Sequence, residues 1–178
     1  MSRGLLLKTT ILEIDPLWHE IAADSPESLN GRSVNKNSYA TGVIGELAVS
    51  QALASLGMSY SHDDTYDYDF LVEGVKLDVK SSASRFERVG GNNSTLLTSY
   101  LKNQDCEAYA FASVSYAENL VYIMGICAKF WFWETGCATD YKAGDIIAVR
   151  PIKQDARIMK YKHLTSFYGL PLLLEALK

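Results

Sequence analysis

The chain has 178 residues, of which 48% are hydrophobic and 21% are charged, and its formal net charge is −4 at pH 7. This length and composition indicate one folded domain with a substantial core, and they exclude an intrinsically disordered chain. Because proteins that bind nucleic acid are usually basic, such a function would have to depend on local charge here.

The first predicted elements lie before residue 58. Residues 1–24 are expected to form a short strand and then a helix near Trp18, and the polar residues 24–38 are expected to form a loop. Residues 39–57 are rich in Ala and Leu, lack proline and end at Gly57, which predicts a helix with a glycine at its C-terminal cap.

Three short strands are predicted next, at residues 58–64, 67–74 and 75–82. The last two are joined at Glu73-Gly74, a pair that favours a hairpin turn. The later predicted elements are a polar connection (83–105) with a helical turn near 96–101, two strands (106–117 and 119–128), a short helix or strand extension (129–136), a strand (144–151) and a closing helix (163–178) with a bend or a new first turn at Pro171. This order predicts a mixed α/β domain.

The cysteines and the N-terminus bear on the cellular location. Cys106, Cys127 and Cys137 contain no CxxC pair, which is typical of reduced thiols rather than of a disulfide framework. No apolar run approaches the length of a membrane span, and Lys8 interrupts the short apolar run near the N-terminus. We therefore expect an intracellular, cytoplasmic protein that contacts no membrane.

The predicted hairpin carries acidic residues on one face. Because strand side chains alternate, Asp78 and Lys80 share a face, and Asp69 of the preceding strand can converge with Asp78. Two carboxylates held together repel each other, and a divalent cation removes that cost. Mg²⁺ usually takes one or two carboxylates together with water and substrate phosphate, and a neighbouring lysine can polarise the attacking water or stabilise transition-state charge.

The predicted helix at residues 39–57 carries one formally charged side chain, Glu46. The helix is apolar nearly all round, so it is expected to be largely buried, although Gly42 and Gly45 weaken its first turns. A lone buried carboxylate is costly unless it is paired or binds a cation. A cation shared with Asp69 and Asp78 would provide that partner.

A Glu on a helix, an Asp, a short hairpin and an (Asp/Glu)-x-Lys triplet resemble the active-site pattern of the PD-(D/E)XK nuclease superfamily. Here the pattern is Glu46 in "GVIGELAVSQAL", Asp69 in "DFLVEG" and Asp78-Val79-Lys80 in "LDVKSS". The residue before Asp69 is a tyrosine where the family name has proline. Asp67 is an alternative to Asp69 as the acidic ligand.

The resemblance implies a restriction-endonuclease-like αβββαβ core with a central mixed β-sheet flanked by helices. It implies a metal-dependent endonuclease that hydrolyses DNA phosphodiester bonds with an activated water and Mg²⁺ or Mn²⁺, and RNA stays open as a substrate. In this family pattern Lys80 orients the nucleophile, and the metal is surrounded by Asp69, Asp78, Glu46 and the backbone carbonyl of Val79. Accessory polar candidates are Ser82, on the strand face of Lys80, and Gln104.

The whole chain is expected to be a single nuclease-like domain, with an N-terminal extension (1–38), a catalytic core (about 40–128) and a C-terminal elaboration (about 129–178). The small size fits an enzyme of a phage or mobile element, and a homodimer would supply the two active sites needed to cut both strands of a duplex.

Local charge favours a nucleic-acid partner more than the net charge does. One basic stretch contains Lys80, Arg85, Arg88 and Lys102 against Glu87 alone. A second, at residues 150–162, has five basic residues against one acidic residue. Phosphate contacts of this kind position a nucleic acid without reading its sequence. We expect Arg85, Arg88 and Lys102 to make these phosphate contacts.

Two other hypotheses belong to different classes. A nuclease-like fold without catalysis could bind nucleic acid or scaffold an assembly, and an α/β domain could bind a small molecule or a protein, which the acidic balance favours. Binding of a divalent metal distinguishes the enzyme from a domain that binds a small molecule or a protein. Cleavage distinguishes it from a nuclease-like fold without catalysis.

Overall fold

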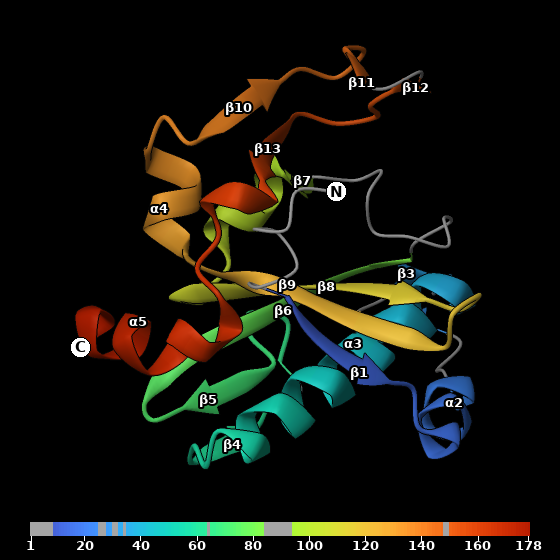
Figure 1. Cartoon of the computed structure of the whole chain (residues 1–178). Helices are drawn as coiled ribbons and strands as arrows, with labels where there is room; N and C mark the ends of the chain where they lie inside the picture. The colour runs from blue at the N-terminus through green and yellow to red at the C-terminus, as the bar shows by residue number, and fades with distance from the viewer. Residues whose placement is uncertain are drawn as a thin grey trace.

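A six-stranded mixed sheet forms the centre of the computed structural model (Figure 1). The structure describes residues 9–24, 28–29, 32–33, 35–63, 65–83, 94–147 and 150–178. In sheet order, the central strands are β1 (Thr10–Glu13), β9 (Leu120–Ala128), β8 (Ala108–Ser115), β6 (Val75–Ala83), β5 (Phe70–Val72) and β4 (Tyr60–His62). The neighbours β6 and β8 run parallel, and the other neighbouring pairs of this sheet are antiparallel.

Helices cover one face of the central sheet. The long helix α3 (Lys36–Ser55) crosses below β6 and β8 in Figure 1, and α5 (Leu170–Leu177) lies toward the other end of the same face. Leu77 and Val79 of β6 pack in one apolar cluster with Leu53 of α3 and Leu174 of α5. The short helix α2 (Pro16–Ala23) packs against α3, with Trp18 buried between them.

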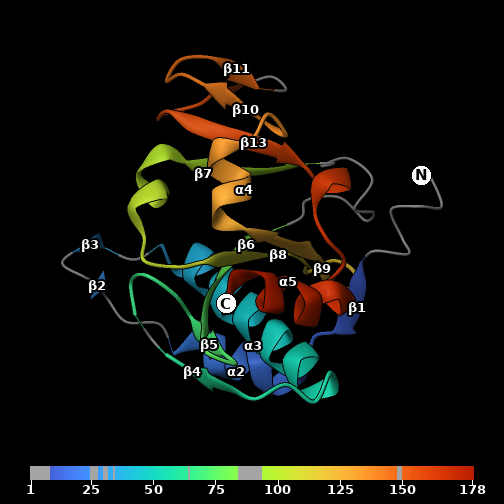
Figure 2. The same cartoon turned by 90° about the vertical axis from the view of Figure 1, so that its left-hand side faces the viewer.

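A second layer lies over the opposite face (Figures 1 and 2). It consists of the sheet β10 (Ala138–Tyr141), β13 (Ala156–Lys160) and β7 (Ser94–Thr98), with helix α4 (Lys129–Glu134) and the 3₁₀ helices η1 (Ser99–Asn103) and η2 (Tyr161–His163). Its core joins Tyr109 and Phe111 of β8 to Phe132, Trp133 and Met159. The remaining elements are the two-residue pairs β2 (Ser28–Leu29) with β3 (Arg32–Ser33) and β11 (Ile146–Ile147) with β12 (Arg150–Pro151), and the 3₁₀ helix η3 (Phe167–Gly169).

Helix α3 begins three residues earlier than predicted, so the loop predicted at residues 24–38 extends three residues too far. Asn35 is the N-cap, and its side-chain oxygen accepts hydrogen bonds from the backbone N–H groups of Asn37 (3.1 Å) and Ser38 (3.2 Å). An asparagine at this position satisfies donors that the first helical turn leaves unpaired, so the helix can start in a polar segment. At the other end, Gly57 adopts the left-handed conformation expected of a cap (φ 67°).

The predicted hairpin is confirmed, because Glu73 (φ 49°) and Gly74 (φ 89°) form the turn between β5 and β6. Three other expectations change. The connection near residues 96–101 is a strand followed by a 3₁₀ turn, residues 144–151 contribute two short strands rather than one, and the closing helix begins only at Leu170, with Pro171 in its first turn. Residues 129–134 form a helix, which decides between the two alternatives for that segment.

The mixed α/β class with a central mixed sheet flanked by helices is confirmed. In the expected αβββαβ order, α3, β4, β5 and β6 follow one another, and β8 then pairs in parallel with β6. The described part of the connection between them, residues 94–107, holds β7 and η1 rather than an α-helix. Among the described helices, none is both long and apolar enough to span a membrane.

Candidate active site

The candidate site lies where strands β5 and β6 separate. The two strands pair only over residues 70–72 and 75–77, whereas β6 continues to Ala83 alongside β8. The backbone N–H of Asp69 donates to the carbonyl oxygen of Leu77 (3.1 Å). Beyond it the carboxylate oxygen Oδ2 of Asp69 accepts the backbone N–H of Val79 (2.6 Å). The side chain of Asp69 thus takes the place of a strand partner beside the Asp78-Val79-Lys80 triplet.

Asp78 and Lys80 lie on one face of β6, as predicted. Asp78 is 3% exposed, and its Oδ2 lies 2.6 Å from the Nζ atom of Lys80. At this distance the Lys80 ammonium and the Asp78 carboxylate form a close, charge-assisted contact. Burial raises the pKa of Asp78 to about 7; the charge of Lys80 opposes the rise, and the charges of Asp69 and Glu46 add to it.

Glu46 is less buried than the sequence indicates. The buried residues of α3 follow one stripe, and the side chain of Glu46 keeps 27% of its surface exposed. Its Oε2 atom lies 3.4 Å from Nε2 of His62 on the edge strand β4. The sequence predicts a cation shared with Asp69 and Asp78 as the partner of this carboxylate, and in the structure His62 is a partner as well, while the charge of Glu46 acts on Asp78.

A close approach between α3 and β6 brings Glu46 next to the site. A Cβ atom added at Gly45 would lie 1.8 Å from Oγ of Ser81 and 2.8 Å from its Cβ. Only glycine lets the helix rest on the strand at this point. The sequence identified Gly45 as a weak helix former and missed this role, which depends on a contact between distant segments.

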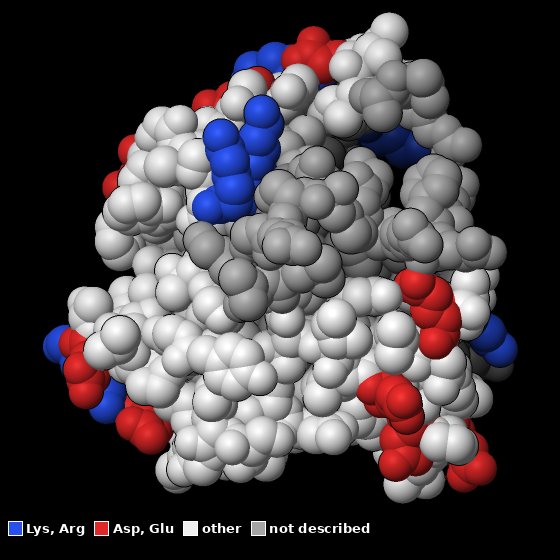
Figure 3. All heavy atoms as spheres, in the orientation of Figure 1, with Lys and Arg blue, Asp and Glu red and all other residues white. Residues whose placement is uncertain are grey.

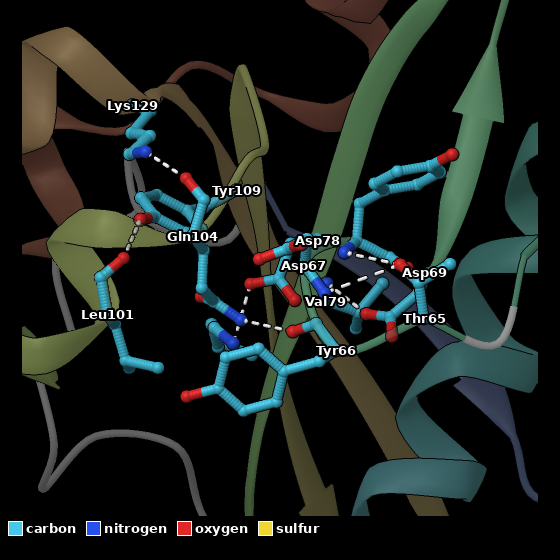
Figure 4. Close-up of polar contacts among 12 residues, drawn as sticks. Thr65, Tyr66, Asp67, Asp69, Asp78, Val79, Leu101, Gln104, Tyr109 and Lys129 are labelled. Atoms are coloured by element: carbon cyan, nitrogen blue, oxygen red, sulfur yellow. Dashed lines mark hydrogen bonds and ion pairs between the residues drawn. The ribbon is translucent and has the colours of Figure 1, made fainter.

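Asp67 and Asp69, the two candidates for the acidic ligand, lie in the loop before β5 and have different hydrogen-bond partners. Oδ1 of Asp67 accepts the backbone N–H of Asp105 (3.2 Å), so this carboxylate ties the loop to the end of η1. Asp69 instead binds Val79 within the triplet. Figure 4 shows these residues together with Gln104 around β6. The geometry favours Asp69 as the second acidic group of the site.

Gln104 supports the loop from the other side. It is 4% exposed, and its Nε2 atom donates to the carbonyl oxygen of Tyr66 (2.8 Å). Lys129 of α4 donates to the backbone oxygen of Gln104. Thr65, Tyr66 and Lys129 were not singled out from the sequence. Of these, Thr65 carried a local signal, because its hydroxyl accepts the backbone N–H of Tyr68 (3.1 Å) in a turn of the kind that threonine favours.

The basic residues that were expected to contact phosphates differ in their placement. Arg85 and Arg88 lie outside the described residues, and Lys102 is exposed on η1. In the second basic stretch, Arg157 is 14% exposed, donates to the carbonyl oxygens of Trp133 and Thr135, and pairs with Asp140, so it has a structural role. Lys and Arg side chains gather over the β13–η2 segment in Figure 3, and acidic ones over β1 and α2.

The carboxylates at the site fit a hard divalent cation bound partly through water. Among the described residues, no group of three or more Asp, Glu, His or Cys side chains is arranged to hold a metal ion. Asp69 and Asp78 offer two carboxylates, and Asp78 is buried with Lys80 beside its Oδ2 atom. Mg²⁺ commonly takes one or two carboxylates and completes its shell with water and substrate oxygens. This donor set therefore fits Mg²⁺ better than it fits a structural Zn²⁺ with four protein ligands.

No family model matches the sequence, and no curated protein matches it significantly. The function is therefore inferred from the geometry of the site.

Proposed function

We propose that the chain is a metal-dependent endonuclease that hydrolyses DNA phosphodiester bonds. The observation that carries this proposal is the arrangement at the separation of β5 and β6. There a buried Asp78 lies 2.6 Å from Lys80, and Asp69 is fixed on the backbone between them. A buried carboxyl with a strongly raised pKa beside a second carboxylate is costly for folding, and such arrangements concentrate at functional sites.

Each side chain has a role in this proposal. Asp69 and Asp78, with the backbone carbonyl of Val79, would hold Mg²⁺ or Mn²⁺, which supplies charge stabilisation at the phosphoryl oxygens and lowers the pKa of the attacking water. Lys80 orients the nucleophilic water and stabilises the charge that develops on the phosphoryl group. Glu46 completes the acidic wall of the site, held by His62.

One observation favours the second candidate, a nuclease-like protein that binds nucleic acid or an assembly without cutting. The described carboxylates do not form a three-ligand group, and Glu46 lies beside His62. A site that has lost its metal could keep Asp78 and Lys80 as a buried ion pair.

The test is cleavage of supercoiled plasmid, linear duplex, single strand, branched junction and RNA, each with Mg²⁺, Mn²⁺ or chelator. Wild type is compared with Lys80→Ala and Asp78→Asn. Matched controls are Lys178→Ala and Glu175→Gln, which make the same chemical changes at exposed C-terminal positions. Binding of Mn²⁺ is measured in parallel by electron paramagnetic resonance.

We expect metal-dependent cutting that both site variants abolish and both controls retain. Nucleic-acid binding without cutting would favour the second candidate. Absence of cutting, together with Mn²⁺ binding that Asp78→Asn leaves unchanged, would contradict the proposed enzyme.

A further inference from the structure

A polar trough runs from the start of α3 along the end of β6. It consists of two adjoining cavities, of about 770 Å³ and about 190 Å³, which share Ser81 and Ser82. The larger is lined by the first turns of α3 and by Tyr116 after β8. The smaller lies between the central sheet and the second layer, and it is lined by Lys80 together with Ser94, Thr95 and Tyr161. The trough thus ends at the lysine of the candidate active site.

The lining of the trough is rich in neutral hydrogen-bond donors. The donors of the larger cavity are side-chain amides and hydroxyls, from Asn35, Asn37, Ser38, Ser81 and Ser82. Among the described residues, those that line the two cavities include no carboxylate, although the chain as a whole has a net charge of −4. Side chains of Ser, Thr, Asn and Tyr, with helix N-termini, are the neutral groups that proteins use to contact nucleic-acid phosphates.

The donors are held in place by the fold. Helix α3 is 20 residues long, and its positive end opens on the larger cavity beside Asn37 and Ser38. Opposite, Thr41 donates its hydroxyl proton to the carbonyl oxygen of Asn37 (2.8 Å), so the hydroxyl of Tyr116, 3.0 Å from Oγ1 of Thr41, donates to Thr41 and fixes the ring on the wall. At about 190 Å³, the smaller cavity between the two sheets has room for a phosphate group of one strand and none for a base-paired duplex.

We infer that this trough binds a single nucleic-acid strand by its phosphates, through neutral amide and hydroxyl donors, and delivers it to Lys80. The inference rests on the proposed function and refines it, because it names an unpaired strand as the substrate.

Binding is measured by fluorescence anisotropy with a labelled oligothymidylate in chelator, so that no cutting occurs. Ser38→Glu places a negative charge in the trough at the third position of α3, where an acidic residue suits the helix end, so folding is retained. The control Leu172→Glu adds the same negative charge at the third position of α5, at a side chain that is 73% exposed and away from the trough. We expect Ser38→Glu to weaken binding by roughly tenfold or more and the control to leave it unchanged.

The salt dependence separates neutral donors from a basic track. For single strands, the logarithm of the affinity falls with the logarithm of salt by about 0.7 for each cation engaged. We expect Asn37→Ala and Ser82→Ala to lower the affinity without changing this slope, and Lys80→Ala to reduce the slope by about 0.7. A change of slope in the two neutral variants would overturn the inference.

Two further outcomes distinguish this inference from the proposed function. If wild type cuts with metal and Lys80→Ala does not, while Ser38→Glu binds the strand normally, the trough is wrong and the enzyme stands. If nothing is cut but Ser38→Glu weakens binding, the trough stands and the non-catalytic candidate replaces the enzyme. Tighter binding of a duplex than of the oligothymidylate would also overturn the inference.

Discussion

At the scale of single residues, Asp78 gives the site a measurable dependence on pH. Burial raises its pKa from 3.8 to about 7 in the folded chain, so between these values the folded state holds a proton that the unfolded state has lost. Stability contributed by this group therefore falls as pH rises from about 4 to about 7. We expect the free energy of unfolding, measured with urea in chelator, to decrease over this range in wild type.

The matched variant is Asp78→Asn, which keeps the shape and cannot ionise. Its free energy of unfolding should change less across the same range, and at pH 8 the variant should lose metal binding without losing its fold. Equal pH dependence in the two proteins would show that Asp78 is not the titrating group.

His62 is predicted to position Glu46. Its ring packs edge-on against Phe70, with centroids 5.1 Å apart, and its Nε2 atom lies 3.4 Å from Glu46 Oε2. Removing a group that holds a metal-binding carboxylate usually lowers metal affinity or activity by roughly tenfold or more. We expect His62→Ala to lower kcat of the cleavage reaction by roughly tenfold with little change in KM, and His62→Gln, which retains an N–H donor, to recover much of it. Equal losses in both variants would indicate a packing role.

At the scale of elements, two glycines of α3 should respond oppositely to alanine. At Gly42 the nearest atom to an added Cβ is Oε1 of Glu46, at 3.9 Å, whereas at Gly45 the new atom would collide with Ser81. We expect Gly42→Ala to raise the free energy of unfolding by about 0.5–1 kcal/mol through helix propensity. Gly45→Ala should lower it by roughly 1–3 kcal/mol through overpacking.

The collision itself is tested by a double-mutant cycle measured by urea denaturation. Ser81→Gly should destabilise the wild-type chain but be less harmful, or favourable, in the Gly45→Ala background, because it removes both atoms that the new methyl group meets. Additive effects would contradict a direct contact between helix and strand.

Local sequence patterns specify some features of these elements and not others. Strand periodicity and the Glu73-Gly74 turn are local, so the hairpin and the shared face of Asp78 and Lys80 could be predicted. The pairing of β7 with β13, the close approach at Gly45 and the contact of Glu46 with His62 join distant segments, and no local pattern specifies them. The early start of α3 had a local signal, the Asn35 cap, which the polar composition around it obscured.

At the scale of the whole molecule, Arg157 connects the parts of the second layer. From β13 it donates to the carbonyl oxygens of Trp133 and Thr135 at the end of α4, and it pairs with Asp140 of β10. Because it is largely buried, removing it leaves carbonyl oxygens unpaired, at a cost of about 1–3 kcal/mol. We expect Arg157→Ala to speed amide hydrogen exchange in β7, β10 and β13 while exchange in α3 stays unchanged.

The control is Lys160→Ala, on the same strand but exposed. It should leave exchange in the second layer as in wild type. Faster exchange throughout the molecule in Arg157→Ala would mean that the two layers unfold together rather than separately.

The placement of β7 has a consequence for synthesis on the ribosome. Strand β7 precedes β8 in the chain, but its sheet partner β13 begins only at Ala156. A nascent chain can complete α3, the β5–β6 hairpin and the pairing of β6 with β8 and β9 while β7 still lacks that partner. The carboxylates and the lysine thus lie in segments that are synthesised before β13, the strand that completes the wall over them. During that interval the unpaired edge of β7 is open to chaperones and to other nascent chains.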